Sequence, residues 1–203
     1  MVNRLFLVGL LSLVLISSAF ADSELWSTNT FQFPFYKAKF NVIPELRFKS
    51  NMSDWYYLRT YIGPSTSLNK QFDLAVFLAP SWSKTGGIWI SSLLGYFDLI
   101  YKQGTPWFTF NNRARFEQNF TNNILIYRNL FLFKNGNWSA GDELFYSTKK
   151  GFFDEGRSSV SYAPLVYNGV EFSVGYLLRR QKTNAGDDWT RTGVLNIGAK
   201  ISY

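Results

Sequence analysis

The sequence of 203 residues contains no cysteine and no histidine. A chain without cysteine has no disulfide, so packing and backbone hydrogen bonds must supply its stability. The chain also lacks the two side chains that bind most transition metals, since thiolate and imidazole are their usual protein ligands. We therefore expect no metal ion and no cofactor.

Long apolar runs are also rare, and the one that stands out lies at the start, from Leu5 to Ile16. Arg4 precedes it, and Ser17-Ser18-Ala19-Phe20-Ala21 follows. A transmembrane helix needs about 20 apolar residues, which this run does not reach. A basic start, an apolar middle and a small-x-small end are typical of a cleavable secretory signal. The sequence predicts a signal peptide over residues 1–21 and one domain over 22–203.

From Asp22 onward, no window approaches the run of apolar residues that a membrane helix needs. A membrane span in this part of the chain must therefore be made of strands. Lipid offers no hydrogen-bond partners to a backbone, so such strands have to close into a barrel.

Aromatic residues are abundant: 20 Phe, 12 Tyr and 7 Trp make up 19% of the chain, while the mean hydropathy is only −0.10. A membrane barrel can place aromatic side chains on its outer wall and at both interfaces, which a soluble core cannot. The net charge of +7 fits solubility or a charged interior, or contact with anionic lipopolysaccharide or an anionic solute. We expect no nucleic-acid partner, because no compact basic motif is present.

Alternation of apolar and polar residues indicates strands throughout the chain. Within 106–120, one face carries Phe108, Phe110, Ala114, Phe116 and Phe120, and the other carries Thr109, Asn111, Arg113, Arg115, Glu117 and Asn119. The last apolar face consists of Leu195, Ile197, Ala199, Ile201 and Tyr203. A final strand that ends on an aromatic residue resembles the assembly signal of bacterial outer-membrane barrels.

Eleven stretches are strand-like, at about 24–33, 37–49, 54–62, 71–81, 87–101, 106–120, 122–133, 138–148, 157–166, 169–180 and 190–203. Single-chain bacterial barrels have even strand numbers. Because Ser91 to Gly95 breaks the alternation, we interpret 87–101 as a loop or inserted element. The prediction is a single antiparallel transmembrane β-barrel of about ten strands, with twelve as the alternative.

Turn signals separate these stretches. Tight turns are expected at 102–106, 134–137 and 167–169, and longer connections at 63–70, 149–156 and 181–188. Asn-Gly at the tight turns favours type I′ geometry. In an outer-membrane barrel, short turns gather at the periplasmic rim and longer loops at the outer rim.

Four short motifs support a family resemblance. They are Arg113-x-Arg115-x-Glu117, Asp142-Glu143, Arg157 and Gly175-Tyr176-Leu177. With these motifs the chain resembles a bacterial family of predicted outer-membrane barrels, domain of unknown function 2490. The resemblance implies an outer-membrane barrel without a settled activity.

The polar faces of the expected strands supply candidate lumen residues: Glu45, Arg47, Arg59, Asp73, Arg113, Arg115, Glu117, Glu143, Arg157, Glu171, Arg179 and Lys200. In a small barrel these residues can fill the interior with Arg–carboxylate pairs. Alternatively, they can line a narrow pore whose arginines prefer anionic solutes.

Catalysis is not expected, because the enzymes known among small outer-membrane barrels generally use histidine as the base. Asp142 and Glu143 are adjacent on a strand and point to opposite faces, so they cannot converge on one substrate atom. The pairs Asp154-Glu155 and Asp187-Asp188 are expected in loops, either solvated or holding a divalent cation that bridges lipopolysaccharide.

Together these patterns predict a monomeric protein of the bacterial outer membrane, with a structural or interaction role or slow solute permeation. Its expected partners are outer-membrane lipid, lipopolysaccharide and the outer-membrane assembly machinery. One alternative is a narrow channel for small solutes, anions among them. Another is a soluble periplasmic barrel that binds an apolar ligand inside, as lipocalins do, and this one requires an apolar inward face.

Overall fold

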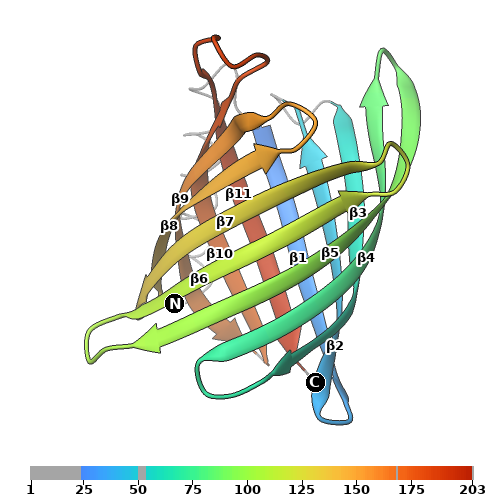
Figure 1. Ribbon diagram of the computed structural model, residues 1–203. Helices are drawn as coiled ribbons and strands as arrows, with labels where there is room; N and C mark the ends of the chain where they lie inside the picture. The colour runs from blue at the N-terminus through green and yellow to red at the C-terminus, as the bar shows by residue number, and fades with distance from the viewer. Residues whose placement is uncertain (1–23, 50–53, 168, 203) are drawn as a thin grey trace.

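The structure is a computed structural model that describes residues 24–49, 54–167 and 169–202, so the expected signal peptide and Tyr203 lie outside the described residues. The described residues form one closed barrel without helices (Figure 1). Its strands are β1 (Glu24–Phe35), β2 (Ala38–Phe48), β3 (Trp55–Ser67), β4 (Phe72–Thr85), β5 (Ile88–Gly104), β6 (Thr109–Asn119), β7 (Ile124–Asn135), β8 (Trp138–Ser147), β9 (Phe152–Tyr167), β10 (Val170–Gln181) and β11 (Thr190–Ser202).

The prediction of a single all-β barrel is confirmed, but its strands number eleven, and not about ten or twelve as predicted. Each strand pairs antiparallel with the next, and β1 pairs parallel with β11 from Glu24↔Val194 to Gln32↔Ser202. In an up-and-down barrel with an odd number of strands, the first and last strands run the same way. Their seam must therefore be parallel, and an even strand number is not needed for closure.

The segment 87–101, which we interpreted as a loop or insertion, belongs to β5. β6 pairs with β5 only as far as Leu94↔Asn119, so the first residues of β5 project beyond the neighbouring strand. There Ile88 and Ile90 are 70% and 51% exposed. In this region β5 pairs with β4 alone, so it is an edge strand whose side chains are exposed on both faces, and for this reason the alternation in the sequence fails there. Regular alternation begins at Leu94, which is buried.

The two ends of the barrel differ in their connections. At the lower end in Figure 1 lie the β1–β2, β3–β4, β5–β6, β7–β8 and β9–β10 connections and the end of β11. The three predicted tight turns all fall at this end. At the upper end lie the β4–β5, β6–β7, β8–β9 and β10–β11 connections, of which β10–β11, residues 182–189, is the longest.

Three turn predictions need correction. Residues 63–70 are strand as far as Ser67 and lie at the lower end, and 149–156 is strand from Phe152 onward. The β7–β8 turn has positive φ at Gly136 alone, whereas both Gly86 and Gly87 have positive φ in the β4–β5 turn. Type I′ geometry, which needs positive φ at both central residues, therefore fits Gly86-Gly87 and not the Asn-Gly turn.

The two faces of the wall have opposite chemistry. Apolar side chains on alternate positions point outward and are exposed, as at Leu78, Phe97 and Phe116. The inward positions between them carry most of the buried charged residues. Among the described residues, buried apolar side chains form two clusters inside the barrel, one of Tyr61, Ala75, Phe77, Ala79, Leu94 and Tyr96, and one of Trp26, Leu177 and Val194.

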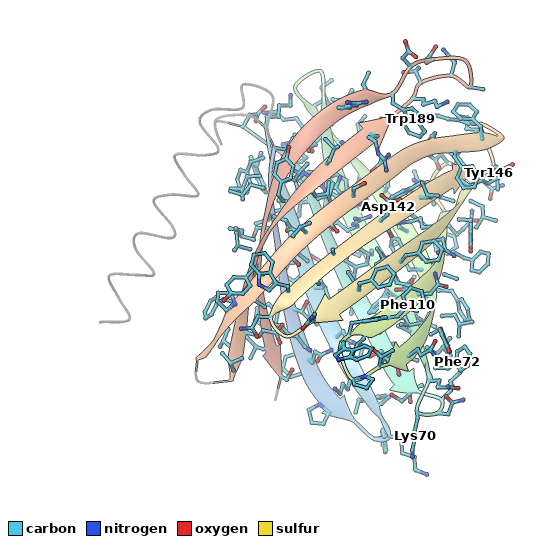
Figure 2. The ribbon with its side chains drawn as sticks, turned by 90° about the vertical axis from the view of Figure 1, so that its left-hand side faces the viewer. Lys70, Phe72, Phe110, Asp142, Tyr146 and Trp189 are labelled. Carbon is cyan, nitrogen blue, oxygen red and sulfur yellow. The ribbon has the colours of Figure 1, made fainter. Side chains whose placement is uncertain are left out.

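Aromatic pairs occur on the outer face near both ends of the strands. Near the upper end the pairs are Trp55–Trp89 and Tyr146–Phe153, and near the lower end they are Phe72–Tyr101 and Trp138–Tyr162. Figure 2 labels Phe72 toward the lower end and Tyr146 toward the upper end. The apolar wall is thus bordered by aromatic side chains above and below. No helix in the described part of the chain is long and apolar enough to cross a membrane.

Candidate functional site

Charged side chains from nine strands meet inside the barrel. We call them the lumenal ion-pair network, and its members are Glu24, Glu45, Arg47, Arg59, Asp98, Arg113, Arg115, Glu117, Arg128, Glu143, Glu155, Arg157 and Arg179. Seven arginines face six carboxylates, so the charges nearly cancel. β4 and β11 contribute no member of the network. Their inward positions carry apolar residues such as Ala79 and Val194, both 0% exposed.

Glu143 on β8 is the centre of the largest group of ion pairs. Arg128 Nη2 donates to both of its carboxylate oxygens at 3.0 Å, and Arg113 Nη2 donates to Oε1 at 2.7 Å. Arg157 Nη1 lies 4.0 Å from Oε2, and Arg128 also reaches Glu117 at 3.2 Å. Three arginines thus share one carboxylate that is only 6% exposed.

A second group lies between β2, β3 and β5. Glu45 accepts hydrogen bonds from Arg47 at 2.6 Å and from Arg59 at 3.0 Å. Arg59 Nη1 also donates to the Tyr96 hydroxyl at 2.6 Å. Glu45 can hold both arginines because alternate positions on one strand share a face, and β3 places Arg59 directly opposite.

Arg115 on β6 and Asp98 on β5 form a bidentate ion pair. Nε and Nη2 each donate to a different carboxylate oxygen at 2.5 Å. Such a pair fixes both side chains in one geometry, which a single contact does not do. Register explains the match, since Asp98 stands opposite Arg115 in the β5–β6 ladder.

The network continues through β9 and β10 to β1. Glu155 accepts from Arg157 and, at 3.2 Å, from Arg179. Arg179 Nη1 lies 3.9 Å from Glu24, whose Oε2 also accepts from Trp26 Nε1 at 2.7 Å. The parallel seam is therefore crossed by side-chain contacts as well as by the backbone ladder.

Aromatic rings separate the arginines and contact their planar faces. The Arg47 guanidinium lies 3.8 Å from the Trp26 ring centroid, and Arg128 and Arg157 each lie 4.3 Å from the Phe145 centroid. Cation–π contacts of this kind stabilise an arginine that has lost its water shell. The inward aromatic side chains thus fill space between charges and help to hold them.

The carboxylates of the lumenal ion-pair network are all paired. Every carboxylate of the network is engaged with at least one arginine, so none is left as an unpaired proton acceptor. Among the described residues, no three acidic side chains gather in a way that could hold a metal ion. Asp154 pairs with Lys150 at 3.0 Å, while its neighbour Glu155 points into the lumen.

A family model described as a protein of unknown function (DUF2490) matches residues 23–190. The chain belongs to this family. No curated protein and no solved structure matches the chain. Of the motifs that carried the resemblance, Arg113, Arg115 and Glu117 on β6, Glu143 on β8 and Arg157 on β9 are members of the network. Asp142 on β8 and Gly175-Tyr176-Leu177 on β10 are not.

Of the twelve lumen residues predicted from the sequence, nine lie in the network: Glu45, Arg47, Arg59, Arg113, Arg115, Glu117, Glu143, Arg157 and Arg179. Asp73 instead pairs with Lys102 near the lower end. Glu171 and Lys200 stand opposite each other in the β10–β11 ladder, are exposed, and form no ion pair within the described part of the chain.

Four network residues were missed: Glu24, Asp98, Arg128 and Glu155. Asp98 lies on the segment taken for a loop, and Glu155 in a range expected to be a loop. Arg128 is the one charged inward residue in the middle of β7, between Ile126 and Leu130, so that strand shows no polar face in the sequence. Glu24 is the first residue of β1, where no alternation precedes it.

One charged cluster lies on the outer face, formed by Asp142, Ser158 and Arg180 from β8, β9 and β10. Arg180 Nη2 donates to Asp142 Oδ1 at 3.0 Å and to Ser158 Oγ at 3.1 Å, and Ser158 donates to Asp142 at 2.5 Å. Beside it runs an apolar groove of about 470 Å³ between Phe131 and Tyr176. Figure 2 labels Asp142 at a height between Phe110 and Tyr146, away from both ends.

A further ion pair marks the upper end. Lys84 Nζ donates to Asp54 Oδ1 at 2.8 Å, and this hydrogen bond lowers the pKa of the Asp54 carboxyl from its ordinary value. Asp54 directly precedes β3, so this pair lies at the rim of the barrel.

Proposed function

We propose that the protein is an integral barrel of the bacterial outer membrane whose lumen is closed by the ion-pair network. In this proposal it acts as a structural or interaction protein, embedded as a monomer in outer-membrane lipid and lipopolysaccharide after insertion by the assembly machinery. The observation that carries the proposal is that the barrel wall is apolar on its outer face and charged on its inner face, the opposite of a soluble protein. Burying charges while exposing Leu78, Phe97 and Phe116 to water would be unfavourable, whereas hydrocarbon outside removes that cost.

The aromatic pairs near both strand ends support the same proposal. Membrane barrels carry an apolar band bordered by aromatic girdles at the two interfaces. A lipocalin-like soluble binder needs the opposite arrangement, with an apolar lumen and a polar exterior. The buried Glu45, Asp98, Arg115 and Glu143 inside this barrel argue against an apolar ligand there.

Closure of the lumen is supported by the burial of the network. Arg47, Arg59, Arg115 and Arg128 are each 6% exposed or less, and all are held by carboxylates. Side chains from facing strands fill the interior of a small barrel in this way. No histidine or cysteine is available for the acid–base or nucleophilic chemistry of known barrel enzymes, so we expect no catalysis.

A narrow channel for small anions is the second candidate, and one observation favours it. The lower end of the lumen opens into a cavity of about 720 Å³ whose wall carries more cations than carboxylates. A ring of positive charge would attract anions if the network let them pass. The two candidates differ in whether ions cross the barrel.

The first test is fractionation of expressing cells, followed by gel mobility of the detergent-extracted protein before and after boiling. We expect recovery in the outer membrane and a shift in mobility on heating, because a closed hydrogen-bonded barrel resists detergent until heated. Recovery in the soluble periplasmic fraction without a shift would overturn the membrane proposal. Conductance in planar bilayers then separates a closed barrel, which gives none, from a channel whose conductance falls on Arg113→Ala plus Arg115→Ala.

A substitution on the outer face tests the membrane proposal independently. In hydrocarbon, Arg180→Ala leaves the Asp142 carboxylate without a cation, with only the Ser158 hydroxyl as donor, so we expect the free energy of unfolding from lipid vesicles to fall by about 2 kcal/mol. In water the same ion pair would contribute at most about 1 kcal/mol. Urea unfolding in vesicles, followed by tryptophan fluorescence, measures the difference.

Lys84→Ala is the matched control, because it breaks the Lys84–Asp54 pair at the upper rim, which in this proposal lies outside the hydrocarbon. We expect that variant to lose less than about 1 kcal/mol. Equal small losses for both variants would contradict a hydrocarbon environment at Asp142.

A further inference from the structure

The cavity at the lower end of the lumen is a vestibule on one side of the ion-pair network. It has a volume of about 720 Å³ and extends from the β1–β2 turn at Lys37 inward to Arg113 and Arg115. Because these two arginines belong to the network, an ion that enters from the lower end meets the charged side chains of the network at the inner end of the cavity.

Positive charge dominates the wall of this vestibule. Six cationic side chains line it, namely Lys37, Lys39, Lys102, Arg113, Arg115 and Lys200, against the two carboxylates Asp73 and Asp98. Both carboxylates are already engaged, Asp73 with Lys102 and Asp98 with Arg115. The remaining cations are therefore not neutralised by the vestibule's own acidic residues.

Three lysines without an ion-pair partner among the described residues line the mouth of the vestibule, and Arg113, which pairs with Glu143, lies at its inner end. Within the described residues, Lys37, Lys39 and Lys200 have no carboxylate within 4.0 Å, although Glu171 stands opposite Lys200 in the ladder. At the inner end, Arg113 donates through Nη2 to Glu143, while its buried Nε has no hydrogen-bond partner. Since this N–H is shielded from the cavity, what Arg113 contributes to the vestibule is its positive charge.

The Ser65 hydroxyl adds a neutral hydrogen-bond donor to the cationic groups of the vestibule. Gln32 Nε2 donates to Asn41 Oδ1 at 2.9 Å, and Asn41 Nδ2 donates to Ser65 Oγ at 2.9 Å. Because the Ser65 oxygen accepts in this chain of hydrogen bonds, its own hydrogen is free to be donated. Ser65 also lines the vestibule.

We propose that the vestibule is a binding site for a small soluble oxyanion of the phosphate class, held between the lysines at the mouth and Arg113 at the inner end. A concave wall of one sign of charge focuses the electric field and concentrates counter-ions. Oxygens of a phosphate group accept charge-assisted hydrogen bonds from both lysine and arginine. The inference rests on the closed lumen proposed above, because an open pore would pass the anion instead of retaining it.

The test is calorimetric titration of the folded protein in a neutral detergent with inorganic phosphate at pH 7 and low salt. We expect saturable binding that weakens about tenfold in the double variant Lys39→Gln plus Lys200→Gln, because two charged donors are lost. We also expect binding to weaken as sodium chloride is added, since salt screens these charges.

The matched control is Lys70→Gln plus Lys134→Gln, which removes the same charge at the same end of the barrel. Both residues are exposed, and neither lines the vestibule. The control should bind phosphate within about twofold of the unmodified protein if the site is local.

Equal weakening by both double variants would overturn the proposal, because net charge alone would then explain the binding. Absence of saturable binding up to about 20 mM phosphate would overturn it as well. Failure of this inference is distinguishable from failure of the proposed function, which is tested by membrane recovery, the heat-dependent shift in mobility and conductance. Each variant is titrated only after it shows the mobility shift of a folded barrel.

Discussion

Glu143→Gln is expected to lower the free energy of unfolding by about 4 kcal/mol, the largest effect of any single substitution proposed here. Glutamine keeps the shape of the side chain but removes the charge that Arg113, Arg128 and Arg157 share. These three arginines would then repel one another in a space with little water. Urea unfolding in micelles, with the temperature at which gel mobility shifts as a second readout, measures the loss.

Glu171→Gln is the control for this substitution. Glu171 also lies on an inward position of its strand, but it is exposed at the lower end and forms no ion pair with the described residues. We expect a change within about 0.5 kcal/mol. If Glu143→Gln were equally mild, the network would not be the source of stability that its geometry indicates.

Gly63→Ala is expected to cost about 3 kcal/mol, because β3 and β4 approach each other too closely for a side chain at this position. A Cβ on Gly63 would overlap the carbonyl oxygen of Val76 and lie 3.0 Å from the Cα of Phe77. Both of these atoms belong to the backbone, so relief requires separation of the two strands. Such a separation would strain the ladder between Ile62↔Leu78 and Ser65↔Ala75. Urea unfolding in micelles measures this loss as well.

Gly104→Ala provides the comparison, since a Cβ at the end of β5 meets no atom within 4 Å. Neither glycine has a positive φ, so the backbone itself accepts alanine at both positions. We expect Gly104→Ala to leave the unfolding free energy within about 0.5 kcal/mol of the original. Similar losses for the two variants would show that steric contact at Gly63 is not the cause.

The regular parts of the barrel could be predicted from the sequence because a strand's two faces meet different surroundings. The alternation in 106–120 placed Arg113, Arg115 and Glu117 together on one face, and β6 directs all three into the lumen. The pattern carries this information wherever one face is apolar and the other polar. It identified nine of the thirteen residues of the network, which are those on the strongly alternating strands.

The remainder could not be predicted because it depends on contacts between strands. Arg128 is recognisable as a lumen residue only when β6 and β8 place Glu117 and Glu143 beside it. Asp98 was not predicted because it lies in the segment 87–101, which was interpreted as a loop. The first residues of that segment project beyond β6 and so lack alternation. The strand number was predicted wrongly for a different reason. The rule that single-chain bacterial barrels have an even number of strands was preferred to the eleven strand-like segments of the sequence.

The parallel seam between β1 and β11 determines how the chain could be rearranged. Ser202 is paired with Gln32, so it lies eight residues along β1 from Glu24, or about 26 Å at the rise of a strand. A barrel with an even number of strands has both termini on one rim, where a few residues suffice to join them. Here a circular permutant would need a linker of at least about eight extended residues that runs the length of the wall. Gene fusions that join the two ends with a tight turn are therefore incompatible with this barrel.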